Sequence, residues 1–129
     1  MRLDTVLSFA MTAALASTGC SSTAEPTVPA GDVTIVLDAS TKGTSAFSPN
    51  PFTESFATRA AVIWVNSDLT SGSYGSTGTA HHLVSDGGLF DSGVIAPGKS
   101  YTFSFAASGT YSYHCSIHST MVGTITITP

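Results

Sequence analysis

Charged side chains are scarce in this sequence, and basic ones are the scarcest. Lysine and arginine together number 4 among 129 residues, against 8 aspartates and glutamates, so the formal net charge is −4 at pH 7. A surface that binds nucleic acid needs clustered basic residues to neutralise phosphates. The sequence has no such cluster, and we therefore expect no nucleic acid among the partners of this protein.

Cysteine is also scarce, and acidic residues paired at catalytic spacing are missing. The 2 cysteines are Cys20, near the N-terminus, and Cys115, which lies among histidines. A disulfide between them would tie the N-terminus to the far end of the folded part, so we expect Cys115 to have another role. Without paired carboxylates for acid–base chemistry, the sequence predicts a protein that is not an enzyme.

A sustained helical period is missing too, and the apolar residues follow strand-like patterns instead. Strands are predicted at residues 33–37, 61–65, 81–85, 93–95, 101–105, 109–115 and 122–127, with a kinked edge segment at residues 47–52. The run 61–65 is apolar enough to be buried on both faces. Residues 66–80, rich in Gly, Ser and Thr, are predicted to form a long loop. Seven or eight short strands separated by turn residues predict an all-β fold, a single antiparallel sandwich or barrel.

The N-terminus has the features of an export signal. Residues 1–19 combine a weakly positive start, an apolar stretch too short to span a bilayer, and small residues at the end. Gly19-Cys20-Ser21-Ser22 resembles a bacterial lipoprotein cleavage site, so that Cys20 is lipidated as the first mature residue; simple secretion is the alternative. Residues 20–31 then form a flexible tether and residues 32–129 the folded domain. We expect a monomer in the bacterial periplasm, or a lipoprotein on the outer side of the cytoplasmic membrane or in the outer membrane.

The residues with the most distinctive chemistry are concentrated in one short segment. Cys115, His118 and Met121 follow one another at intervals of three, at the end of a predicted strand and in the loop after it. Such a loop can turn all three side chains toward one point. A fourth ligand can come from the adjacent histidines His81 and His82. One thiolate, two imidazoles and a thioether form the donor set of a blue-copper site, whereas structural zinc takes four strong ligands.

The order of these motifs closely resembles that of the plastocyanin/azurin family of cupredoxins. The resemblance covers about residues 32–129, and it rests on the segments 47–52, 64–68, 81–86, 90–93, Pro97-Gly98 and 109–121. The short spacing of cysteine, histidine and methionine is most similar to that of amicyanin. Ile117 replaces a proline found in many members, so an additional N–H enters the ligand loop. The resemblance implies a cupredoxin-like Greek-key β-sandwich that binds one type 1 copper ion.

The resemblance also implies a role for each residue of the site. The family pattern of histidine, any residue, an aliphatic residue, any residue, serine and aspartate fits residues 81–86, so His81 rather than His82 is the upstream ligand. The implied copper ligands are His81, Cys115, His118 and Met121. Residues near these ligands are candidates for hydrogen bonds that tune the copper, namely His82, Ser116 and Asn66.

Two histidines remain without a ligand role. His82 and His114 each neighbour a ligand on a predicted strand, so alternation turns their side chains away from the copper. A second copper held by these two histidines would make the protein an enzyme. The histidine count disfavours this alternative.

The function implied by the resemblance is electron transfer through a copper ion that alternates between Cu(II) and Cu(I). His118 would be the partly exposed ligand, surrounded by an apolar docking rim of Leu83, Ile117 and Met121. Such a rim suits transient contacts with redox proteins, for example cytochromes or oxidoreductases. Periplasmic copper storage or delivery by the same fold is the alternative.

Overall fold

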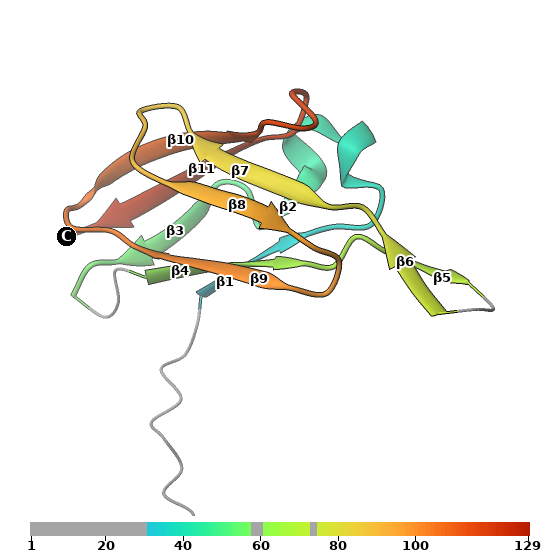
Figure 1. The fold of residues 1–129 in the computed structure, drawn as a ribbon. Coiled ribbons are helices and arrows are strands. Elements are labelled where there is room, and N and C mark those ends of the chain that lie inside the picture. The colour runs from blue at the N-terminus through green and yellow to red at the C-terminus, as the bar shows by residue number, and fades with distance from the viewer. Residues whose placement is uncertain (1–30, 58–60, 73–74) are drawn as a thin grey trace, which may run out of the picture.

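The protein forms a sandwich of two β-sheets (Figure 1). The computed structural model describes residues 31–57, 61–72 and 75–129. One sheet has the order β2-β1-β4-β9, with β2 (Phe47–Ser48), β1 (Gly31–Ile35), β4 (Ala61–Asn66) and β9 (Ser100–Ser104). The other has the order β3-β11-β10-β7-β8, with β3 (Phe52–Ser55), β11 (Val122–Thr128), β10 (Gly109–Cys115), β7 (His81–Ser85) and β8 (Asp91–Ile95). The predicted all-β sandwich is confirmed.

The predicted export signal, Cys20 and nearly all of the predicted tether lie outside the described residues. Among the residues that the structure does describe, no helix has the length and apolar character needed to cross a membrane. Two short 3-10 helices, η1 (Ala39–Thr41) and η2 (Gly43–Ala46), connect β1 to β2.

Two strand pairs are parallel, which the prediction of a purely antiparallel sandwich missed. β1 pairs with β4 in parallel, and β3 pairs with β11 in parallel. Parallel neighbours need a connection that returns the chain to the same end of the sheet. In both cases the chain passes through the opposite sheet between the two partners, and a pattern of alternating residues cannot reveal such a path.

Alternation along the strands creates the core between the sheets. In β4 every second side chain is buried, including Trp64 and Asn66, and the others are partly exposed. The expected burial of residues 61–65 on both faces is therefore wrong, because the outer face of this sheet borders solvent. The Trp64 ring lies 5.2 Å from that of Phe90 and 5.6 Å from that of Tyr113, so aromatic packing joins the two sheets.

The segment 66–80 is not the predicted long loop. It contains β5 (Leu69–Gly72) and β6 (Gly75–Gly78), which pair as an antiparallel hairpin and project from one end of the sandwich (Figure 1). Strand pairing uses backbone groups, so a segment of small polar residues can form a ladder without the apolar alternation that makes a strand recognisable.

The pairing of β7 with β10 places the predicted ligand segments side by side. Cys115, the last residue of β10, lies opposite Leu83 in the register. His81 is the first residue of β7. Residues 116–121 then turn the chain back into β11 at the same end of the sandwich.

Gly123 of β11 provides a test of this packing. It lies opposite Tyr113 in the register, and a Cβ atom at Gly123 would overlap the buried Tyr113 ring. That ring packs 4.8 Å from Phe47 between the sheets, so it has little room to move. We expect Gly123→Ala to lower the free energy of unfolding by about 1–3 kcal/mol, the usual cost of overpacking a core. Urea denaturation measures this change.

Gly87→Ala is the matched control, because a Cβ at Gly87 would meet no heavy atom within 4 Å. Its effect should stay within about 0.5 kcal/mol, as is usual for surface substitutions. Equal stability of the two variants would contradict the packing described for Tyr113.

Candidate metal centre

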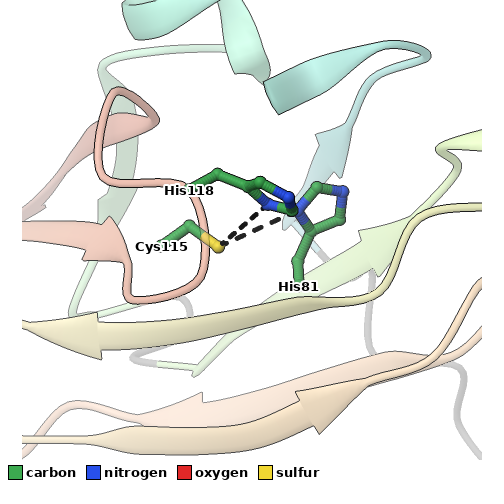
Figure 2. A group of neighbouring side chains, drawn as sticks. All are labelled: His81, Cys115 and His118. Atoms are coloured by element: carbon green, nitrogen blue, oxygen red, sulfur yellow. Dashed lines mark hydrogen bonds between the residues drawn. The ribbon is translucent and has the colours of Figure 1, made fainter. Parts of the chain in front are cut away.

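Three donor atoms converge beneath the ligand loop (Figure 2). Cys115 Sγ lies 3.8 Å from Nδ1 of His81 and 3.8 Å from Nδ1 of His118. One ligand atom from each of the three residues lies within 4.8 Å of the others. His81 and Cys115 are fully buried, and His118 is partly exposed. The structure therefore brings the thiol of Cys115 and the imidazole of His118 together with the imidazole of His81, which lies 34 positions before Cys115 in the chain.

The spacing of these donors fits a metal ion. A first-row metal held at about 2.3 Å from sulfur and about 2.0 Å from nitrogen, in the plane of the three donors, would separate sulfur and nitrogen by roughly 3.7 Å. Both observed separations are 3.8 Å. One thiolate with two imidazoles is the equatorial set of blue-copper sites. The residues present thus fit a copper ion.

Hydrogen bonds close the ligand loop around the site. The N–H of Cys115 donates to the carbonyl of Met121 at 3.0 Å, and the N–H of Met121 donates to the carbonyl of His118 at 2.9 Å. The Thr120 hydroxyl donates to the carbonyl of Ser40 in η1 at 3.1 Å. These contacts hold the loop in a tight turn, with the Met121 side chain fully buried. The role of Met121 as a copper ligand stays a prediction.

A buried carboxylate orients His81. Nε2 of His81 lies 3.0 Å from Oδ2 of Asp68, and neither side chain is more than 2% exposed. Asp68 belongs to the connection between β4 and β5, which was expected to be part of a long loop. Sequence reasoning missed this contact. Asp68 lies within one of the segments that carry the family resemblance, but nothing local in the sequence shows that it meets a histidine 13 positions away.

Hydrogen bonds to the sulfur control the charge of the site. Burial by itself would raise the pKa of the Cys115 thiol. A hydrogen bond with the His81 side chain and three from backbone N–H groups outweigh burial and lower the pKa to about 6. The three N–H groups belong to His82, His118 and Ile117, so the residue that replaces the family's proline is among the groups that lower this pKa.

The pKa of His81, whose ring contacts this thiol, is raised, whereas the pKa of the thiol is lowered. Burial would lower the pKa of His81, but its contacts with Cys115 and Asp68 raise the pKa above the ordinary value of 6.5. In the metal-free protein, a thiolate and a protonated imidazole therefore stabilise each other. The negative groups that attract this proton would also attract a metal cation.

The neighbours proposed to tune the site have different roles in the structure. His82 contributes its backbone N–H to the sulfur, while its side chain contacts Asp91 on the other face of the sheet. Ser116 donates its N–H to the carbonyl of His82 at 2.8 Å. The Asn66 side chain accepts the N–H of Asp68 at 3.0 Å. Asn66 thus holds Asp68, and Asp68 in turn contacts the predicted ligand His81.

The two remaining histidines do not come together into a further cluster. His114 Nδ1 lies 2.6 Å from Oδ1 of Asp86, whereas His82 contacts Asp91. Among the described residues, the one group of three or more metal-binding side chains consists of His81, Cys115 and His118. Nothing in the described part of the chain therefore supports a second copper at His82 and His114.

The expected apolar rim is wrong at two of its three positions. Leu83 and Met121 are both 0% exposed and belong to the core, because Leu83 is on the inward face of β7 and Met121 is enclosed by the ligand loop. Ile117 is 51% exposed, as a docking residue must be. Leu37 and Leu69, which the sequence did not single out, are 47% and 37% exposed.

Comparisons with known proteins agree with this fold. The sequence profile of a family described as copper binding proteins, plastocyanin/azurin family, matches residues 39–128. A purple cupredoxin from Nitrosopumilus maritimus is similar in structure, with a TM-score of 0.61, 23% identity, and coverage of 75% of this chain and 98% of that one. A Cu(I) form of an amicyanin variant gives a TM-score of 0.56 at 17% identity, covering 76% of this chain and 81% of that one.

A copper-containing nitrite reductase from Thermus scotoductus SA-01 is also similar in part. Its TM-score is 0.56 at 23% identity, over 76% of this chain but only 22% of the reductase. At such identities these likenesses show the fold alone. No curated protein gave a match to this sequence.

The charge of the metal-free site can be tested by titrating the thiol. In a Cys20→Ser variant, which leaves Cys115 as the one thiol of the chain, thiolate absorbance should appear with a midpoint near pH 6. An ordinary cysteine would titrate near about pH 8.5. His81→Ala should move the midpoint upward, because it removes a hydrogen bond to the thiolate. A midpoint at or above pH 8 with His81 intact would contradict the electrostatics described for this site.

Proposed function

The chain belongs to the plastocyanin/azurin family of copper-binding proteins, and we propose that it carries single electrons between larger redox proteins. The observation that carries this proposal is the convergence of one sulfur and two imidazole nitrogens. Copper bound there supplies a one-electron couple, because sulfur ligands favour Cu(I) and imidazole suits Cu(II). Cys115, His81 and His118 would hold it, with the buried Met121 as a weak fourth ligand.

A rigid donor set favours electron transfer over copper delivery. Cys115 is anchored in β10, and His81 is held by β7 and by the Asp68 carboxylate. Donors that keep their positions in both oxidation states need little rearrangement when an electron arrives or leaves. A delivery protein, by contrast, must release its metal readily, which the full burial of His81 and Cys115 opposes.

The exposed part of the site suggests where redox partners dock. His118 is partly exposed, and the neighbouring Ile117 is 51% exposed. Leu69 follows Asp68 in the chain, and Leu37 precedes Asp38, whose N–H binds Asp68. Since Asp68 contacts His81, these two exposed leucines lie at the same end of the sandwich as the site. A small apolar surface of this kind suits partners that must dissociate quickly.

The oxidised, copper-loaded protein tests the proposal. We expect intense visible absorption from thiolate-to-copper charge transfer and a reversible one-electron couple in voltammetry. His81→Ala should abolish the absorption, whereas His82→Ala, which alters the adjacent histidine facing Asp91, should keep it. Absence of a reversible couple, together with rapid loss of copper to a mild chelator, would favour storage or delivery and contradict the carrier.

We also propose that the protein is exported and anchored through a lipid at Cys20. The apolar stretch within residues 1–19 and the lipoprotein-like Gly19-Cys20-Ser21-Ser22 support this. In a bacterial host, the full chain should be recovered in the membrane fraction, attached to the outer side of the cytoplasmic membrane. Cys20→Ser should release it from membranes, because the attachment site for the lipid is lost. Recovery of both proteins in the same soluble fraction would show that the chain is secreted without an anchor.

A further inference from the structure

We propose that Asp68 is a positioning residue of the copper site. Its buried carboxylate holds His81 in the tautomer that binds metal through Nδ1, and its negative charge favours Cu(II) over Cu(I), which lowers the reduction potential. The second part rests on the proposed function, since it assumes that the bound copper changes its oxidation state.

The tautomer follows from the two contacts of the His81 ring. Nε2 lies 3.0 Å from the Asp68 carboxylate. On the other side of the ring, Nδ1 faces Cys115 Sγ at 3.8 Å, as Figure 2 shows. A carboxylate only accepts hydrogen bonds, so Nε2 must carry a proton. When copper is bound, the lone pair of a neutral ring is then on Nδ1, directed at the site. Without Asp68, the proton could occupy either nitrogen.

The carboxylate is itself held on several sides. Oδ1 accepts the N–H of Asp38 at 2.9 Å, and Oδ2 lies 3.3 Å from the N–H donor of Ala39. The backbone of Asp68 donates to Asn66 Oδ1 and accepts the N–H of Thr79 at 3.1 Å. The carboxylate therefore cannot rotate away from His81 without breaking its contacts with Asp38 and Ala39, and the backbone contacts fix the position from which it extends.

The same segment supports the ligand loop. Asp38 and Ala39 lie at the start of η1, and Ser40 of η1 accepts the hydroxyl of Thr120 in the loop. His81 and the loop that bears His118 are thus fixed against one short helix. Through these contacts, the position of the His81 imidazole depends on the same segment as the position of the His118 imidazole.

The charge of Asp68 acts at short range. Asp68 is 1% exposed, and His81 is its one salt-bridge partner in the part of the chain that the structure describes. Charges interact more strongly in a buried environment than across water. A carboxylate bonded to a ligand imidazole also makes that ligand more basic. Both effects stabilise Cu(II) more than Cu(I), because Cu(II) has the higher charge.

Asp68→Asn tests the proposal, since it removes the charge and keeps the size and a carbonyl oxygen for the N–H of Asp38, while an amide NH2 group takes the place of Oδ2, which faces His81 and the N–H of Ala39. Loss of such a partner of a ligand histidine typically costs about 10-fold or more in metal affinity. We expect Cu(II) affinity to fall about 10-fold and Cu(I) affinity to change less. A 10-fold change in their ratio corresponds to about 59 mV, so the reduction potential should rise by up to that amount. Voltammetry and competition titrations of the full chain measure both.

Asp91→Asn is the matched control. Asp91 contacts His82 as Asp68 contacts His81, but its side chain is 64% exposed and His82 faces away from the site. The control should leave both copper affinities and the potential unchanged. An unchanged Cu(II) affinity and potential in Asp68→Asn, or equal shifts in the two variants, would overturn the proposal.

A second measurement decides the case if Asp68→Asn does not fold. In the diamagnetic Cu(I) or Ag(I) form of the unaltered protein, NMR should show a slowly exchanging proton on Nε2 of His81. Its absence would overturn the positioning role. The proposed function can fail independently of this inference. If copper binds but shows no reversible couple, the protein is not an electron carrier. The Cu(II) affinities of the two variants would still decide the role of Asp68.

Discussion

The register between β7 and β10 is the constraint on which the site depends. Cys115 pairs opposite Leu83, and His81 lies two positions before Leu83 on the same inward face. A slip of one residue would turn the whole inward set toward solvent and separate the sulfur from the imidazole. The same set fills the core next to Tyr113 and Trp64, so the packing that stabilises the sandwich also sets the register. Stability and metal-binding geometry therefore have a common origin.

The two histidines of the site are held in different ways. His81 is buried, with one nitrogen bonded to a carboxylate and the other facing the sulfur. His118 is partly exposed in a loop whose shape depends on Cys115, Met121 and Thr120. One imidazole is thus part of the core, whereas the other reaches the surface. This division suits a site that must keep its geometry and still exchange electrons with a partner outside.

The charged groups of the site influence one another's protonation. Hydrogen bonds lower the pKa of Cys115 to about 6, and Cys115 and Asp68 raise the pKa of His81. Thiolate and carboxylate therefore attract a cation from opposite sides of the same ring. In the metal-free protein that cation is a proton, and in the loaded protein it would be copper.

The sequence by itself determined the features that depend on local order. Alternating residues predicted most strands, and the spacing of Cys115, His118 and Met121 predicted one loop with three donors. Tertiary structure decided what depends on distant neighbours: the parallel strand pairs, the hairpin at β5 and β6, and the burial of Leu83 and Met121. It also decided the contact of Asp68 with His81. The spacing of residues along the backbone is a property of the chain itself. Burial, and a contact between residues 13 positions apart, exist only after the two sheets have packed against each other.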